Sequence, residues 1–449
     1  MAEKLGFATL AFFLFSIFSS AIDFIPYSTV ARPSLVAAVV GLLVVGLSGR
    51  GAAIFRHKIT IVLVALTVWF VAGVPFAIWP GGAVATISTQ WLVAFLSLFL
   101  TAGLIWNLDQ FRKIVNLISY AAIILALIAL VLNKRSPDGR LMMEGRYSNS
   151  NDLATMLLIS LPFLGFTAMR PDNGVRRLVA AAGFAPILLA VMGTASRGGM
   201  VGAAVALLVF FFNVGFAQKM KLMLVVSVGL ALVLTIMPGA VAARFASLFS
   251  DQADMSQMDD AALSSFASAQ SRKMLLLDSI TVSLQHPIMG VGPGNFPVAQ
   301  NTLALARGEE TGDWHLTHNT YTQLSSESGI PGLLLFLAAI VLCLRCISRT
   351  LKLPVPPDSS AMRDIRAIAL TLRVSLAAFL SCAIFASLAY MPVVTILSGL
   401  ALALEYCATK QLAAAPPPVR TLRGVPASYA WQGTRPRPLP VRSAVARRA

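Results

Sequence analysis

The sequence predicts an all-α polytopic membrane protein with about twelve transmembrane helices. Two observations lead to this fold class. The chain of 449 residues is 57% hydrophobic and only 12% charged, and so few charges cannot cover the surface of a soluble globule with this apolar content. Apolar runs of about 17 to 24 residues also recur along the chain, and each can cross a hydrocarbon core of roughly 30 Å as a helix.

Twelve apolar runs are predicted to span the membrane. They lie at residues 5–22, 30–47, 59–79, 83–105, 114–132, 153–169, 177–194, 199–216, 221–240, 329–347, 367–390 and 392–408. The second run contains Arg32 and Pro33, and little more than Met391 and Pro392 separates the last two. The first run could be a signal peptide, but its apolar part is long for one, which favours a retained helix.

The net charge of +16 would suit a nucleic-acid-binding protein, but the basic residues are distributed as in a membrane protein. With the N-terminus inside, most of the 35 lysine and arginine residues fall in cytoplasmic connections and in the C-terminal tail. This distribution follows the positive-inside rule and explains the charge without nucleic acid. Both termini are then cytoplasmic. All four cysteines lie in helices or at their inner ends, so no disulfide framework is predicted.

Residues 1–408 are predicted to form one transmembrane bundle, into which a large outer segment at 241–328 is inserted. Within this segment we expect a helix at 271–285, ended by Pro287, and a second helix at 318–328 that closes on Gly329. The tail at 409–449 is basic and rich in proline, and we expect it to be a disordered cytoplasmic segment.

Isolated arginines on the predicted outer side are candidate anion-binding residues. Arg272 would lie in the first turn of its helix, where the macrodipole disfavours a cation unless an anion binds beside it. Arg197 lies in the outer turn "TASRGG", in which Gly198 and Gly199 permit a close approach. Arg146, in the polar loop at 133–152, is a weaker candidate. The alternatives are an arginine paired with a carboxylate, or one that reaches the lipid headgroups.

His318 is the candidate proton acceptor. On a helix that begins there, Tyr321, Thr322 and Ser325 would share its face, and an imidazole can accept a proton from a hydroxyl near neutral pH. The alternative is a histidine that caps the helix or faces water. A metal site formed by Asp313, His315 and His318 is conceivable, but it lacks a clear fourth ligand.

These motifs together resemble the bacterial O-antigen ligase and O-antigen polymerase superfamily. His318-Asn319, nine residues and then Gly329-x-x-Gly332 resemble its H-[N/S/Q]-x9-G-x-x-G signature before a late membrane helix. "SRKMLLLDSITVSLQHPIMGVGPGNF" resembles its R-x(n)-P-x-x-G-x-G-x-x-x-F block, with Arg272 as the arginine. "TASRGG" and "GRYSNSNDLA" also resemble elements of that family, and the resemblance spans roughly residues 5–408.

The resemblance implies a GT-C-like membrane glycosyltransferase that takes a glycan from undecaprenyl diphosphate and transfers it to a hydroxyl on the periplasmic face of the inner membrane. Such a transfer would be inverting, with neither metal nor cofactor. Arg197 and Arg272 would hold the diphosphate, and His318 would activate the acceptor. We expect four further residues to contact the substrates: Arg146, Asn319, His315 and Tyr321.

The acceptor stays open at this point. An O-antigen ligase, which uses lipid A-core, is preferred to a repeat-unit polymerase, an exopolysaccharide polymerase or a protein O-oligosaccharyltransferase, because the His-Asn-x9-Gly-x-x-Gly pattern is intact. The alternative from another functional class is a transporter. Transporters keep ionisable groups near the middle of the bilayer, whereas here the polar residues gather in the outer loops.

Overall fold

The structure is a computed structural model that describes residues 2–25, 33–136, 139–170, 174–221, 223–224, 227, 260–308, 314–355 and 359–414. Within these residues the fold is almost entirely helical. They contain no β-strand, and one isolated bridge joins Arg135 to Leu141. This agrees with the all-α prediction.

The helices follow the apolar runs of the sequence. Their bounds are α1 (Ala2–Ser19), α3 (Pro33–Leu47), α4 (Arg50–Phe55), α5 (Lys58–Gly73), α6 (Pro80–Thr86), α7 (Leu92–Gly103), α8 (Leu108–Leu132), α9 (Ser150–Met169), α10 (Gly174–Gly193), α11 (Arg197–Asn213), α14 (Asp260–Gln285), α15 (Phe296–Ala306), α16 (Thr320–Leu351), α17 (Ser360–Cys382) and α18 (Val393–Ala414). A π-helical turn at Ile87–Trp91 joins α6 to α7, so that they form one continuous span.

Nine spans among the described residues are long and apolar enough to cross a membrane. Two shorter apolar helices, α3 and α11, match the second and eighth predicted runs. The ninth predicted run, at 221–240, lies largely outside the described residues. The chain is therefore a multi-pass membrane protein, as its composition predicted.

The run at 367–390 was placed too far along the chain. Helix α17 begins at Ser360 and ends at Cys382, and residues 383–392 form the connection to α18. The helix ends because the chain here pairs with another segment. The Ala383 carbonyl accepts a hydrogen bond from the Thr320 N–H at 2.8 Å, and the Ala386 carbonyl accepts one from the Thr320 hydroxyl at 2.7 Å.

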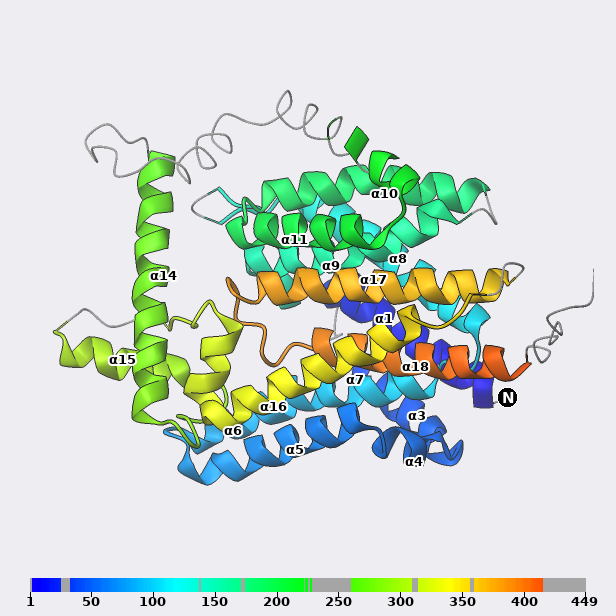
Figure 1. Cartoon of the computed structure of the whole chain (residues 1–449). Coiled ribbons are helices and arrows are strands. Elements are labelled where there is room, and N and C mark those ends of the chain that lie inside the picture. Colours follow the sequence, from blue (N-terminus) through cyan, green and yellow to red (C-terminus); the bar gives the residue numbers. More distant parts are fainter. Residues whose placement is uncertain are drawn as a thin grey trace, which may run out of the picture.

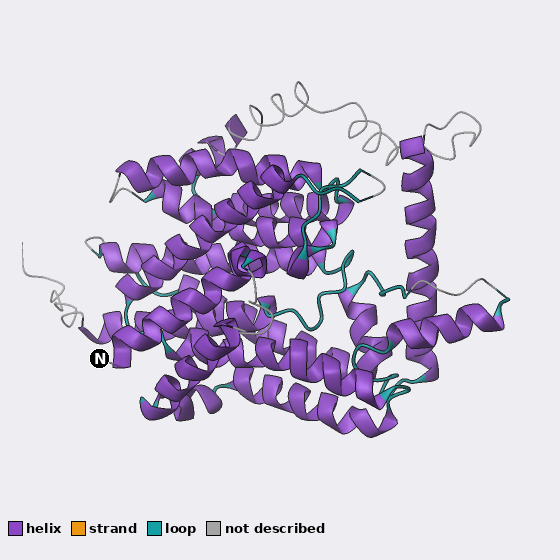
Figure 2. Ribbon diagram, turned by 180° about the vertical axis from the view of Figure 1, so that it is seen from behind, coloured by secondary structure: helices purple, strands orange, loops and turns teal. Residues whose placement is uncertain are grey.

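The spanning helices pack side by side, and α14 crosses one end of this bundle nearly at right angles to them (Figure 1). We call α14, the turn at 286–295 and α15 the arm, and this end of the bundle the arm end. The N-terminal end of α1 lies at the opposite end (Figure 1). Viewed from behind, several connecting loops gather beside α14 (Figure 2). Three of the residues singled out from the sequence, His315, His318 and Asn319, lie in the loop directly before α16.

One apolar core runs through the bundle, and the arm has a small core of its own. The main core includes fully buried Trp91, Phe111 and Phe379. The core of the arm consists of Leu275, Val282, Val291, Phe296 and Ala299. This small core joins α14, the turn and α15 to one another.

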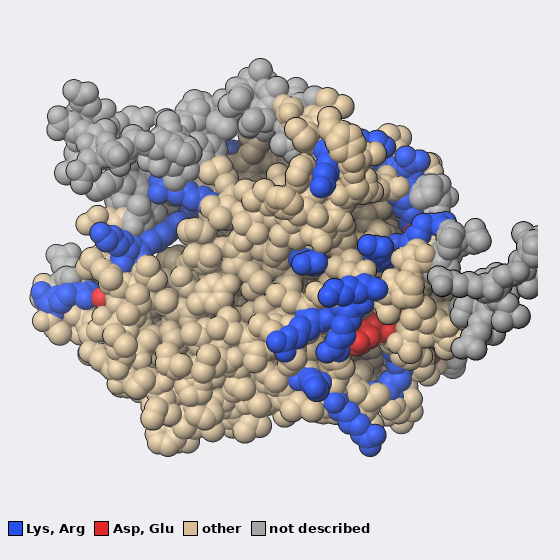
Figure 3. Space-filling view, in the orientation of Figure 1, with Lys and Arg blue, Asp and Glu red and all other residues tan. Residues whose placement is uncertain are grey.

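Basic side chains gather at the end opposite the arm (Figure 3). Arg50 is the first residue of α4, and its guanidinium donates hydrogen bonds to the carbonyls of Gly103 at 2.9 Å and Ile105 at 2.8 Å. It also lies over the rings of Trp106 and Tyr406. Arg50 therefore caps the C-terminal end of α7, where a cation is favourable.

Candidate functional site

His318 lies just before α16 and not on it. The Asn319 side chain accepts hydrogen bonds from the backbone N–H groups of Tyr321 at 2.9 Å and Thr322 at 3.1 Å, so the helix begins at Thr320. His318 has a left-handed backbone with φ of 50°. The predicted helix start at His318, and the shared face with Tyr321, Thr322 and Ser325, were therefore wrong.

The connection between α17 and α18 holds the His318 backbone. The His318 N–H donates to the Ser387 hydroxyl at 2.9 Å, and the Tyr321 hydroxyl donates to the Leu380 carbonyl at 2.9 Å. Asn319 caps the helix, and Tyr321 anchors it to the end of α17. Asn319 and Tyr321 therefore help to position His318. Their predicted contact with a substrate stays a prediction.

The imidazole of His318 lies among cationic groups. Burial, followed by the positive charge of Arg272, then by His315 and Arg140, lowers the pKa of His318 from 6.5 to about 4. These neighbours come from three segments, namely α14, the loop before α16 and the loop between α8 and α9. The structure therefore brings His318, Arg272 and His315 together, and it adds Arg140. At neutral pH the imidazole is uncharged and can accept a proton.

Arg272 lies in the middle of α14, and its side chain is half-buried. We expected its helix to begin at residue 271, but α14 already begins at Asp260. The argument from the helix macrodipole was therefore wrong, because that effect fades beyond the first turn. A role of Arg272 in anion binding is instead supported by its position beside His318.

Arg140 was missed by sequence reasoning, which chose Arg146 from the same loop. Only 9% of Arg140 is exposed. Its guanidinium donates to the Thr194 carbonyl at 2.9 Å and to the Asn151 side-chain oxygen at 2.8 Å. Arg146 is exposed on the 3-10 turn Gly145–Tyr147. The sequence feature that favours burial of Arg140 is the apolar stretch "LMM" directly after it, which indicates that this part of the loop is buried.

Arg197 is the first residue of α11, at the same end of the bundle. The Ser196 hydroxyl caps this helix by accepting a hydrogen bond from the Gly199 N–H at 3.1 Å, and it donates to the Asn151 oxygen that Arg140 also contacts. A side chain at position 198 would lie 2.5 Å from the Cβ of Phe385, in the connection that holds His318. The close approach expected of the glycines after Arg197 is confirmed.

The glycine-rich turn after α14 packs directly against α16. Gly290, Gly292 and Gly294 all have φ between 68° and 100°, which favours glycine. Gly329 interrupts α16 with φ of 71°, and a Cβ there would lie 1.9 Å from the Ile288 carbonyl oxygen. The predicted break at Gly329 is confirmed, and the glycines permit backbone-to-backbone contact between the turn and α16.

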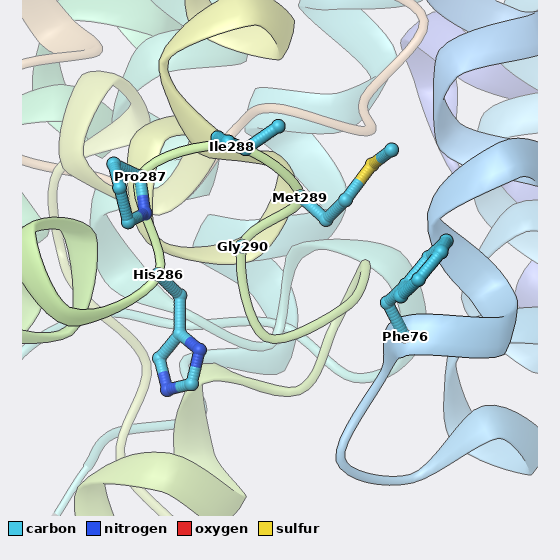
Figure 4. Close-up of a pocket in the computed structure, with 6 residues that line it drawn as sticks. All are labelled: Phe76, His286, Pro287, Ile288, Met289 and Gly290. Atoms are coloured by element: carbon cyan, nitrogen blue, oxygen red, sulfur yellow. The ribbon is translucent and has the colours of Figure 1, made fainter.

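A cavity of about 330 Å³ lies beside this turn (Figure 4). Its lining residues are Phe76, His286, Pro287, Ile288, Met289 and Gly290. The side chains of Phe76 and Met289 approach each other across it, and the ring of His286 points away from them (Figure 4). None of the candidate site residues lines this cavity, so we do not place the reaction there.

The metal alternative is not supported by the described residues. They contain no group of three or more histidine, cysteine, aspartate or glutamate side chains that could hold a metal ion. Asp313, the third member of the conceivable site, lies outside the described residues.

Comparison with known proteins gives one family. Residues 182–337 match the family described as O-Antigen ligase. The match covers the turn of Arg197, the arm with Arg272, His318 and both glycines of the Gly329-x-x-Gly332 pattern. It confirms the resemblance inferred from the motifs. A search among curated proteins finds no match to this chain.

One solved structure aligns with 77% of this chain and 96% of its own, at 15% sequence identity and a TM-score of 0.38. It is described as "Structural coordination of polymerization and crosslinking by a peptidoglycan synthase complex". At this score the likeness carries no inference about the present chain.

Proposed function

The chain belongs to the O-antigen ligase and polymerase superfamily through residues 182–337, and on this premise we propose that it transfers a glycan from undecaprenyl diphosphate to a hydroxyl acceptor. We propose an O-antigen ligase, with lipid A-core as the acceptor. The observation that carries the proposal is the placement of the His318 imidazole close enough to the guanidinium groups of Arg272 and Arg140 for their charges to lower its pKa.

The proposed chemistry follows from these groups. His318 accepts the proton of the acceptor hydroxyl as its oxygen attacks the anomeric carbon. The bond from that carbon to the diphosphate breaks, and the electron pair leaves with the diphosphate. Arg272, Arg140 and Arg197 stabilise the departing negative charge, and the bidentate fork of arginine suits phosphate oxygens. Attack opposite to the leaving group inverts the anomeric centre. Because the cations are supplied by the protein, we expect no metal requirement.

The proposed orientation places the arm end in the periplasm and both termini in the cytoplasm. The gathering of lysine and arginine at the opposite end supports this placement, because cytoplasmic ends of inner-membrane proteins are enriched in these residues (Figure 3). In this orientation Arg272 and Arg197 would lie near the membrane surface, where the headgroup of undecaprenyl diphosphate would also lie.

The test uses purified protein in lipid nanodiscs with an undecaprenyl-diphosphate-linked glycan and lipid A-core. His318→Ala should abolish transfer while membrane insertion and thermal unfolding stay as in the wild type. The matched control is His286→Ala, a histidine of the arm that lines the separate cavity. Normal transfer by His318→Ala would remove this residue from the reaction, and with it the proposed mechanism.

The acceptor is tested by deleting the gene in the native host and analysing its lipopolysaccharide on gels. A bare core together with free lipid-linked long chains would support the ligase. A core capped with a single repeat would indicate a polymerase, and unaltered lipopolysaccharide would point to an exopolysaccharide or glycoprotein product. If the purified protein instead moves a lipid-linked glycan or small solute across a membrane without forming a new glycosidic bond, it is a transporter.

A further inference from the structure

Glu327 is a carboxyl group buried at the junction of three segments. It lies on α16, two residues before the break at Gly329, and none of its surface is exposed. Burial of a carboxyl group is unfavourable unless its partners compensate for the lost water. An apolar side chain would avoid this cost, so the partners of Glu327 indicate what the carboxyl group does.

These partners come from the turn of the arm and from the α17–α18 connection. The Tyr390 hydroxyl donates a hydrogen bond to Oε2 of Glu327 at 2.6 Å, and the Gly294 N–H donates to the same oxygen at 2.9 Å. The Phe296 N–H and the Gln323 side chain also face this carboxyl group. The backbones of turn and helix are joined as well, since the Gly292 N–H donates to the Glu327 carbonyl at 2.9 Å.

The carboxyl group of Glu327 lies beside the turn that leads into α15. This helix begins at Phe296, and the side chain of its N-cap residue, Asn295, makes no capping hydrogen bond. The first N–H groups of a helix need acceptors, and its N-terminus favours a negative charge. Glu327 comes from a different helix and accepts the N–H of Gly294, directly before the N-cap residue Asn295, so it fastens the start of α15 to α16.

The rest of the arm is linked to α15 by charge. Arg307, which directly follows α15, forms two hydrogen bonds at 2.7 and 3.0 Å with the carboxylate of Asp278 on α14. Asp278 is buried, and such a bidentate pair fixes the orientation of both partners. Helix α14 also meets α16 directly where the hydroxyls of Ser283 and Ser325 lie 2.7 Å apart. Helix α14 carries Arg272.

We propose that Glu327 is a positioning residue whose carboxyl group, held by Tyr390 and by the turn before α15, sets the place of the arm and thereby of Arg272 beside His318. Only the expected effect of Glu327 on glycan transfer rests on the proposed function. The placement of the arm is a structural property that can be measured without any substrate.

Placement is tested by electron paramagnetic resonance distances in nanodiscs. Spin labels are attached at Leu305 of α15 and Val131 of α8, which are both exposed. Glu327→Gln and Tyr390→Phe should broaden or shift the distance distribution found in the labelled wild type. The matched control is Asp364→Asn, which removes a carboxylate paired with Arg112 away from the arm, and it should leave the distribution unchanged. An unchanged distribution in both Glu327→Gln and Tyr390→Phe would overturn the proposal.

Transfer measurements then connect placement to the reaction. Misplacing Arg272 should lower kcat by roughly ten- to a hundredfold in Glu327→Gln. The acid limb of the pH profile should also move to higher pH, because His318 loses a positive neighbour. The double substitution Ser283→Cys and Ser325→Cys allows a disulfide that joins α14 to α16 directly. In the Glu327→Gln background this disulfide should restore much of kcat and return the acid limb toward its wild-type position.

The outcomes separate this inference from the proposed function. A shifted distance distribution with a normal rate and an unshifted acid limb would overturn the link between Glu327 and Arg272. If His318→Ala transfers glycan normally, the proposed mechanism fails, but the distance measurements still decide whether Glu327 places the arm. Tyr390→Phe removes only one hydroxyl, so it tests the same contact if Glu327→Gln fails to fold.

Discussion

Replacing Arg272 by glutamine should move the pH dependence of glycan transfer in a direction fixed by the surroundings of His318. Burial, and then the charge of Arg272, lower the pKa of His318 from 6.5 to about 4. A full return to 6.5 would correspond to about 3 kcal/mol, since each pH unit is about 1.4 kcal/mol. Burial is the largest cause, so removal of Arg272 alone should raise the pKa by up to about one pH unit.

The sign follows from the form of the imidazole that reacts. His318 accepts a proton only when it is neutral, so activity is lost as the pH falls through its pKa. The acid limb of kcat/KM should lie near pH 4 in the wild type, because this parameter reports the free enzyme. In Arg272→Gln the limb should lie at higher pH, because the imidazolium is no longer disfavoured by that charge.

Arg272→Lys is the matched variant for this measurement. Lysine keeps the positive charge, so the acid limb should stay near that of the wild type, but the rate should fall because the bidentate fork is lost. The assay is transfer in nanodiscs at several pH values from about 3 to 8, so that the activity is measured on both sides of the expected limb. An acid limb near 6.5 in the wild type, or identical limbs in the wild type and Arg272→Gln, would refute the electrostatic argument.

Three further changes test other parts of the structure. Gly329→Ala should lower the free energy of unfolding by at least about 2 kcal/mol, measured by denaturation in detergent, because its Cβ meets the Ile288 carbonyl; wild-type stability would contradict the backbone contact. Arg140→Ala should cost about 2 kcal/mol by the same assay, because it leaves the Asn151 and Thr194 oxygens without a charged donor; it should also weaken donor binding, whereas Arg146→Ala should do neither. A chelator should leave transfer unchanged, and strong inhibition that added metal reverses would favour the metal alternative.

The sequence was sufficient where a local pattern decides the structure. Uninterrupted apolar runs predict membrane helices because a backbone in lipid must satisfy its own hydrogen bonds. The break at Gly329 follows from a glycine two residues before a proline. The turn at Arg197 was found because a charged residue with adjacent glycines is unusual between apolar helices.

The remaining features depend on contacts between distant segments. Whether Arg140 or Arg146 is buried is decided by Asn151 and Thr194, and no local pattern separates the two arginines with certainty. The left-handed backbone of His318 is held by Ser387, which follows it by 69 residues. Glu327 was not identified from the sequence, because its partners lie on other elements of the folded chain.

The hydrogen bond between the His318 N–H and the Ser387 hydroxyl has a pharmacological consequence. The histidine is tied to the α17–α18 connection, so a small molecule bound between that connection and residues 317–318 would misalign the imidazole without occupying the place of either substrate. Such a compound would be a non-competitive inhibitor with respect to the lipid-linked donor, so a high donor concentration in the membrane would not reverse the inhibition.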